Sequence, residues 1–142
     1  MNGNGDYTQE PSEAMYPGDR VVDYVGLAVY DYCNGYCTSN TVDGRWDAWV
    51  DPQPGARRDN GLLHHSTFAR AHGKPIAFTE WGLWRTSRPP GGGGDNAEFI
   101  RRFALWMRNH DAAYQIYNEG HSGHSLGNFP TARTRHRAKF GG

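Results

Sequence analysis

The mostly apolar run at residues 21–30 constrains the fold of this chain more than any other segment. It reads Val-Val-Asp-Tyr-Val-Gly-Leu-Ala-Val-Tyr and is rich in β-branched and aromatic side chains. A strand that is buried on both faces of a parallel sheet has such a nearly continuous apolar run, whereas a half-exposed strand alternates apolar and polar residues. The run therefore predicts a strand over residues 21–30 within a parallel sheet.

The rest of the chain alternates further strand-like and helix-like segments. Short apolar runs predict strands over residues 74–82 and 112–117, and helices are expected over 61–72, after Asp95, and over 130–140, where Pro130 suits the first helical position. The polar stretch from 31 to 60 is long for a plain connector and is more typical of a functional loop. The order strand, helix, strand, helix, strand, helix predicts an α/β fold made of right-handed βαβ units.

The helix after Asp95 has the clearest local signals. A Pro-Pro-Gly-Gly-Gly-Gly breaker at 89–94 precedes Asp95, the candidate N-cap, and Glu98 follows three residues later, as in a capping box. Apolar residues then recur at three- and four-residue spacing and form one stripe, while the arginines lie mostly outside it. The stripe consists of Phe99, Ile100, Phe103, Trp106 and Met107.

Composition narrows the range of ligands. The chain has 142 residues, with 15 basic and 15 acidic side chains that cancel, so neither nucleic acid nor a membrane is expected as a partner. No apolar run is long enough to span a bilayer, and residues 1–6 lack the features of a secretory signal. Aromatic residues make up 13% of the chain, and their rings suit ligands with apolar faces and polar edges, such as sugars, as well as a protein core.

Glu80 is the first candidate for chemistry, because it stands at the carboxyl end of the predicted strand 74–82. It lies between aromatic residues in Phe-Thr-Glu-Trp-Gly-Leu-Trp, and in a (β/α)₈ barrel the strand ends and the loops after them form the active site. A structural carboxylate that pairs with an arginine is the alternative interpretation.

The two cysteines, Cys33 and Cys37, leave three possibilities open. They stand close together in a polar segment, where a small disulfide loop, half of a metal site or two free thiols are all compatible with the spacing. A zinc site would need two further ligands, and His121 and His124 are the candidates, which would make the chain a zinc-dependent hydrolase.

Several short motifs occur in an order that resembles a known family. The motifs are Tyr16-Pro17-Gly18-Asp19 before 22–27, then Tyr30-Asp31, then 73–76 leading into Thr79-Glu80-Trp81-Gly82, then 126–130 and 137–140. This series resembles the final three strands of a clan A glycoside hydrolase, and glycoside hydrolase family 26, the β-mannanases and related β-glycanases, is the closest family. The resemblance implies a partial (β/α)₈ TIM barrel, roughly strands six to eight with their helices.

The same resemblance implies the architecture of the whole enzyme. Residues 1–142 would be the C-terminal part of the catalytic domain, with the N-terminal half of the barrel absent, since a complete barrel takes about 250 residues. A sheet of this kind is expected to expose strand edges and the apolar face that would meet the other strands.

The family resemblance also implies roles for individual residues. Glu80 corresponds to the nucleophile of a retaining enzyme, and Tyr30, which is also a candidate core residue, corresponds to a tyrosine that hydrogen-bonds this nucleophile. Trp81 and Trp84 would form a sugar platform, one of them alternatively packing under the loop. Further polar contacts with the sugar are expected from Asp31, Asn118 and His124. Family members often carry an acidic residue at the position of Ala28, which leaves the details of substrate contact open.

A retaining glycosidase needs a second carboxyl group about 5–5.5 Å from the nucleophile, and it serves as acid and then base. In the clan this residue is a glutamate on strand four, which has no counterpart in this chain. Glu119 follows Asn118 but comes after the third predicted strand, so a role in a substrate loop or in the structure is expected for it rather than acid–base chemistry.

These observations predict a fragment of a retaining glycoside hydrolase. It would cleave O-glycosidic bonds in a β-linked polysaccharide of the mannan or glucan type, without metal or cofactor, and would be inactive alone. The parent enzyme is expected to be extracellular, because polymeric substrates lie outside the cell. The alternative is a non-catalytic carbohydrate-binding or structural domain derived from such a barrel.

Overall fold

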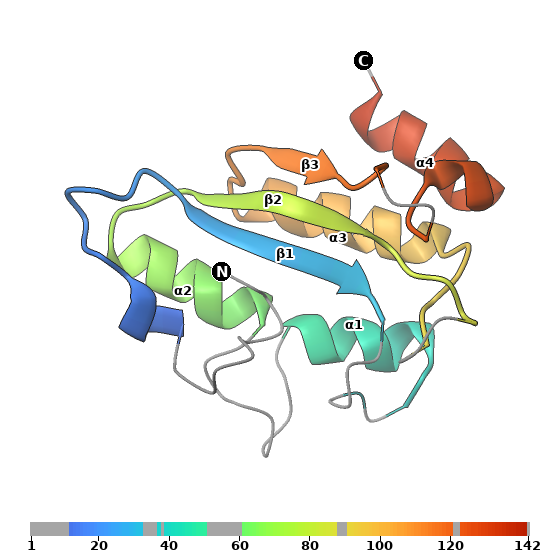
Figure 1. Cartoon of the computed structure of the whole chain (residues 1–142), viewed down its shortest axis with the longest axis horizontal. Helices are drawn as coiled ribbons and strands as arrows, with labels where there is room; N and C mark the ends of the chain where they lie inside the picture. Colours follow the sequence, from blue (N-terminus) through green and yellow to red (C-terminus); the bar gives the residue numbers. More distant parts are fainter. Residues whose placement is uncertain are drawn as a thin grey trace.

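A computed structural model describes residues 12–32, 37, 39–50, 61–87, 91–120 and 123–141. These residues form an α/β arrangement around a parallel sheet of three strands in the order β1-β2-β3 (Figure 1). None of the helices in these segments is both long and apolar enough to cross a membrane. The elements in chain order are η1 (Ser12–Met15), β1 (Val25–Asp31), α1 (Val42–Val50), α2 (Leu62–Ala71), β2 (Ile76–Leu83), α3 (Ala97–Asn109), β3 (Gln115–Tyr117), η2 (Leu126–Asn128) and α4 (Pro130–Phe140).

Strand β1 confirms the predicted parallel strand but is shorter and buried on one face only. It begins at Val25 rather than at residue 21, because the chain still turns at Gly18, whose φ is 105° and whose carbonyl accepts a hydrogen bond from Val21 N at 3.2 Å. Burial alternates along the strand, and the side chains at 26, 28 and 30 are half-buried while those between them are buried. Burial on both faces, which the apolar run predicted, is therefore wrong for the described part of the chain.

The helices α1, α2 and α3 run along one side of the sheet, and the core lies between them and the strands (Figure 1). Phe78 of β2 packs against Phe103 of α3 with ring centroids 4.6 Å apart, and Trp106 lies 5.7 Å from the same ring. All five residues of the apolar stripe predicted for α3 are buried, which confirms that helix.

The other face of the sheet is exposed in the part of the chain that is described. Tyr24, Tyr114 and Ile116 are 47%, 40% and 55% exposed, and the rings of Tyr24 and Tyr114 touch edge to face at 5.4 Å. Apolar and aromatic side chains are therefore exposed on this face. This exposure also means that side chains at the ends of the strands on this face are open to a ligand.

The cap of α3 differs from the prediction by one residue. Asn96, not Asp95, accepts a hydrogen bond from Phe99 N at 3.0 Å. Asp95 instead accepts from Thr131 N at 3.0 Å and Ala132 N at 2.7 Å, so it supplies the cap of α4, whose own N-cap side chain makes none. Burial alone would raise the pKa of Asp95, but these backbone hydrogen bonds outweigh it and lower the pKa. Helix α4 begins at Pro130, as predicted.

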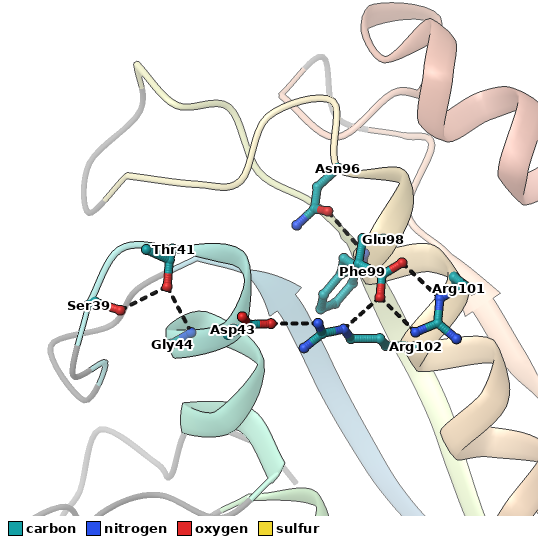
Figure 2. A network of polar contacts seen from close by, with 9 residues as sticks. All are labelled: Ser39, Thr41, Asp43, Gly44, Asn96, Glu98, Phe99, Arg101 and Arg102. Carbon is teal, nitrogen blue, oxygen red and sulfur yellow. Dashed lines mark hydrogen bonds and ion pairs between the residues drawn. The ribbon is translucent and has the colours of Figure 1, made fainter.

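Helix α1 was not predicted, because it lies in the polar stretch 31–60 that reads as a loop. Thr41 precedes it and accepts a hydrogen bond from Gly44 N at 3.1 Å, while Ser39 pairs with the Thr41 hydroxyl at 2.8 Å (Figure 2). Trp49 anchors the helix in the core and is 3% exposed. Much of the rest of this predicted loop, at 33–36, 38 and 51–60, lies outside the described residues.

Glu98 joins α3 to α1 rather than closing a capping box. Its carboxylate accepts from Arg101 at 2.7–2.8 Å and from Arg102 at 2.8 Å, and Arg102 also reaches Asp43 of α1 at 2.5 Å (Figure 2). The hydrogen bonds from Arg101 and then Arg102 lower the pKa of Glu98 to about 2. This network therefore stabilises the fold only while Glu98 is ionised.

Replacing Glu98 by Gln is expected to lower the free energy of unfolding by about 0.5–1 kcal/mol at pH 7, the range for a network that is partly exposed to solvent. A carboxyl group whose pKa is lowered on folding contributes stability above its unfolded value, here near 4.5, and loses it as the pH falls toward 2. Urea denaturation at pH 7 and pH 3 should thus give a difference that shrinks on acidification. The exposed Asp47 of α1 makes no ion pair with described residues, so Asp47→Asn is the control, and a pH-independent effect of Glu98→Gln would contradict the assignment.

Candidate functional site

A β-bulge in β2 places Glu80 on the uncovered face of the sheet. Leu27 of β1 pairs with Phe78, but the next residue, Ala28, pairs with Glu80, so Thr79 is an extra residue. The pairing with β3 shifts over the same stretch. Thr79 and Glu80 are consequently both exposed, while Phe78 before them is buried. Bulges commonly redirect a side chain next to a functional site.

Three polar side chains meet in the carboxyl-terminal half of the sheet, although β2 continues three residues beyond Glu80 to Leu83. The Tyr30 hydroxyl of β1 donates a hydrogen bond to Glu80 Oε1 of β2. Asn118 directly follows β3, and its Nδ2 donates to the Tyr30 hydroxyl at 2.6 Å and to Glu80 Oε1 at 3.2 Å. Parallel strands bring their carboxyl ends to the same edge of a sheet, which explains why residues far apart in sequence converge here. The hydrogen bond between Tyr30 and Glu80 that the family resemblance implies is therefore present.

Burial raises the pKa of the Tyr30 hydroxyl, the hydrogen bond from Asn118 opposes this shift, and the contact with Glu80 adds to it. Tyr30 thus stays protonated at neutral pH and acts as a donor to the carboxylate. Both hydrogen bonds that the Glu80 side chain accepts from described residues end on Oε1, and no described residue donates to Oε2. One carboxylate oxygen is held in place, and the other has no hydrogen-bond donor among the described residues.

An aromatic wall stands beside Tyr30. Trp84 lies 5.5 Å from the Tyr30 ring and 4.8 Å from the imidazole of His124, and the rings of Tyr30 and His124 are 4.6 Å apart. Gly82 makes this packing possible, because a Cβ there would lie 3.2 Å from Tyr30 and 3.6 Å from His124. Trp84 is half-buried and so still offers surface to a ligand.

His124 packs against the rings of Tyr30 and Trp84. It is 4% exposed, and its Nδ1 lies 2.8 Å from the carbonyl oxygen of Leu83, to which it donates. The expected polar contact with a sugar is not favoured by this burial. We assign the imidazole to holding Trp84 and Tyr30 in place.

Trp81 belongs to the core and not to the site. It is 0% exposed, packs against Phe103 at 4.8 Å and Tyr117 at 4.9 Å, and its Nε1 donates to Gln115 at 2.5 Å. The expectation that Trp81 contributes to a sugar platform is therefore wrong. The reason is the bulge, after which Trp81 points toward the helices.

Asp31 differs from the expected sugar contact in a similar way. It is 1% exposed, and its two oxygens accept from Arg45 Nε at 3.0 Å and Asn96 Nδ2 at 2.7 Å. Burial raises the pKa of Asp31, with Arg45 and then Asn96 opposing that shift. The side chain has almost no surface for a ligand, so we assign it to the structure that supports the loop after β2.

The glycines of the 89–94 run, which the sequence presents only as a breaker, close that loop. Gly93 N donates to the Asp31 carbonyl at 3.0 Å and Gly94 N to the Trp84 carbonyl at 2.9 Å. A Cβ at Gly93 would lie 1.8 Å from Asp31 Oδ2, so only glycine allows this approach without rearrangement. The sequence analysis missed Arg45, Asn96 and Gly93 as partners of Asp31, and the glycine run was their only local signal.

Glu119 has a structural contact. Its two oxygens lie 3.1 and 3.2 Å from Leu126 N, which donates to the carboxylate at the start of η2. Of the two roles expected for this residue, the structural one is supported by this contact.

The proposed zinc ligands do not form a site in the described part of the chain. Cys37 is disulfide-bonded, and the only other cysteine in the sequence, Cys33, lies outside the described residues, as does His121. A disulfide sulfur is not a thiolate and does not bind zinc in the manner of a structural site. The described residues contain no group of three or more potential metal ligands.

No family model matches the chain, and no curated protein or solved structure matches it significantly. Function must therefore be argued from the residues and geometry of this chain.

Proposed function

We propose that the chain carries the nucleophile of a retaining glycoside hydrolase, with Glu80 in that role. The substrate would be a β-linked polysaccharide of the mannan or glucan type, in line with the resemblance to glycoside hydrolase family 26. One observation carries the proposal. Glu80, Tyr30 and Asn118 come from or directly follow three parallel strands and are joined by hydrogen bonds.

The geometry suits a carboxylate nucleophile. Tyr30 and Asn118 fix Oε1, so Oε2 is presented in a defined direction for attack on an anomeric carbon. As the new carbon–oxygen bond forms, the bond to the leaving oxygen breaks, and the sugar becomes an ester of Glu80. Trp84 would contact the C–H face of the sugar ring, since aromatic faces suit such apolar patches.

A natural glycoside also needs a proton on its leaving oxygen. Among the described carboxylates near the strand ends, Asp31 is buried and paired, and Glu119 is occupied by Leu126 N. We therefore expect the chain alone to accept a sugar from a leaving group that departs without a proton, but not to hydrolyse a polysaccharide.

The proposal is tested with a 2,4-dinitrophenyl 2-deoxy-2-fluoro-β-mannoside, whose phenolate leaves unprotonated and whose fluorine slows breakdown of the ester. Intact-protein mass spectrometry should detect one added fluorosugar, and peptide mapping should place it on Glu80. Glu80→Gln should remove the label, whereas Glu119→Gln is the matched control and should retain it. A folded protein that takes no label, or takes it elsewhere, would reject Glu80 as the nucleophile.

A non-catalytic carbohydrate-binding domain is the second candidate function. The carboxylates of Asp31 and Glu119 are both held by other residues, which favours this function. Sugar binding would need Trp84 and the polar side chains of Tyr30, Glu80 and Asn118, but no acid. Calorimetric binding of manno-oligosaccharides, weakened by Trp84→Ala and accompanied by no covalent label, would identify this function.

A further inference from the structure

The zero net charge of the chain conceals an uneven distribution of charge. Helix α4 contains no acidic residue and carries four cations besides His136, all of them exposed. These α4 cations are Arg133, Arg135, Arg137 and Lys139. The neighbouring helix α3 has three arginines, two of which bind carboxylates.

The difference between the two helices lies in their ion pairs. Arg101 and Arg102 of α3 bind Glu98, and Arg102 binds Asp43 as well (Figure 2). In contrast, none of the α4 cations forms an ion pair with any residue in the described segments. Within the described segments, no carboxylate neutralises the charge on α4.

Helical geometry arranges the α4 cations in two rows. With 3.6 residues per turn, Arg133 and Arg137 align along one side, and Arg135 and Lys139 along another. The side at Ala132, His136 and Phe140 faces inward, where His136 and Phe140 lie 5.8 and 5.3 Å from the Trp81 ring. The outward ridge between the rows carries Thr134 and Ala138, which are exposed and uncharged.

This arrangement is unfavourable for the helix itself. Like charges four residues apart repel each other on a helix surface. The helix dipole favours cations in the last turn, which suits Arg137 and Lys139, but it disfavours Arg133 near the N-terminal end. Intrahelical stability thus gives no account of Arg133, whereas an anionic ligand lying along the helix would.

We propose that the α4 cations bind an acidic polysaccharide, a sugar chain that carries carboxylates. A hollow of about 630 Å³, lined by Arg135, Thr131, Thr134 and Ala97 among others, adjoins the ridge and gives such a chain a place to lie. The choice of a polysaccharide as the polyanion rests on the proposed function. The absence of ion pairs between the α4 cations and other described residues does not depend on that function.

Other polyanions fit the helix less well. Single-stranded nucleic acid is held by aromatic side chains that stack on its bases, and the exposed positions of α4 carry none. An interfacial membrane helix inserts an apolar face, but the apolar side of α4 is turned toward Trp81.

The test uses the full chain with polygalacturonate as the probe, and highly methyl-esterified pectin as the same backbone without most of its charge. Binding to immobilised polysaccharide should be tighter for polygalacturonate and should weaken as salt rises and the Debye length falls from about 10 Å at 0.1 M to about 3 Å at 1 M. The Arg135→Gln/Lys139→Gln variant removes the row of cations beside the hollow and should bind at least about tenfold more weakly, the order expected for two lost charge contacts in water. Gln keeps a similar helix propensity.

The matched control is Arg20→Gln/Arg70→Gln, which removes the same charge from exposed positions outside α4 and should leave binding unchanged. Equal loss in both variants, equal affinity for esterified pectin, or tighter binding to duplex DNA or to anionic phosphatidylserine vesicles would overturn the proposal. The Glu80→Gln variant should keep its binding to polygalacturonate whether or not Glu80 is a nucleophile. Failure of the nucleophile proposal would therefore leave the binding proposal intact.

Discussion

Replacing Trp81 by alanine is expected to lower the free energy of unfolding by about 3–5 kcal/mol, the usual cost of truncating a large buried aromatic side chain. The indole is 0% exposed and contacts rings of α3, β3 and α4, so truncation would leave a cavity where three elements meet. It would also leave Gln115 without its indole donor. Urea denaturation monitored by far-UV circular dichroism measures the effect.

Trp84→Ala is the matched control, because it truncates the same residue type three positions further along the chain. Trp84 is half-buried, so we expect a smaller loss of about 1–2 kcal/mol. Its ring lies beside Tyr30, and this variant should be the one that loses affinity for oligosaccharides. If Trp81→Ala instead reduced ligand binding at unchanged stability, the division between a core tryptophan and a site tryptophan would be wrong.

The elements with strong periodic patterns could be predicted from the sequence. Residues 99–107 have one apolar stripe, and 74–82 and 112–117 are short apolar runs, so α3 and the parallel strands follow from local chemistry. Glu80 was predicted at the carboxyl end of its strand, but β2 continues to Leu83, so only the carboxyl-terminal half of the strand was predicted correctly for Glu80. Because parallel strands end at one edge of the sheet, its proximity to Tyr30 and Asn118 follows from topology.

The orientation of side chains in β2 could not be predicted. Strict alternation would place Phe78 and Glu80 on one face, but the extra residue Thr79 resets the pattern and puts Trp81 in the core. A bulge depends on pairing with neighbouring strands, which no local pattern records. The sequence therefore identified both tryptophans as candidates and could not tell which of them reaches the site.

Long-range polar contacts were missed for a related reason. Asp31, Arg45 and Asn96 lie in three different segments, and nothing in the local sequence predicts that they meet. Asp95 and Asn96 are both good capping residues, and tertiary contact with α4 decides which of them caps α3. The short helix α1 was not predicted, because the residues around it are polar, although Trp46 and Trp49 are spaced as on one face of a helix.

Replacing Arg45 by Met is expected to lower the free energy of unfolding by about 3–5 kcal/mol at pH 7, because it leaves the carboxylate of Asp31 buried without its cation. The two side chains are 5% and 1% exposed, so water cannot take the place of the guanidinium. Arg45 also donates to Asn40 at 2.8 and 2.9 Å, and this link to the start of α1 would be lost as well. Chemical denaturation gives the size of the effect.

The effect should depend on pH in a defined direction. Burial already raises the pKa of Asp31 above its ordinary value of 3.8, and loss of Arg45 would raise it further. A group with a raised carboxyl pKa carries no penalty below its unfolded value and an increasing penalty as the pH rises above it, so Arg45→Met should be less destabilising at pH 4 than at pH 7. The double variant Asp31→Leu/Arg45→Met removes both charges and should recover part of the stability. A single variant as stable as the wild type, or a pH-independent loss, would show that the pair is not a buried ion pair.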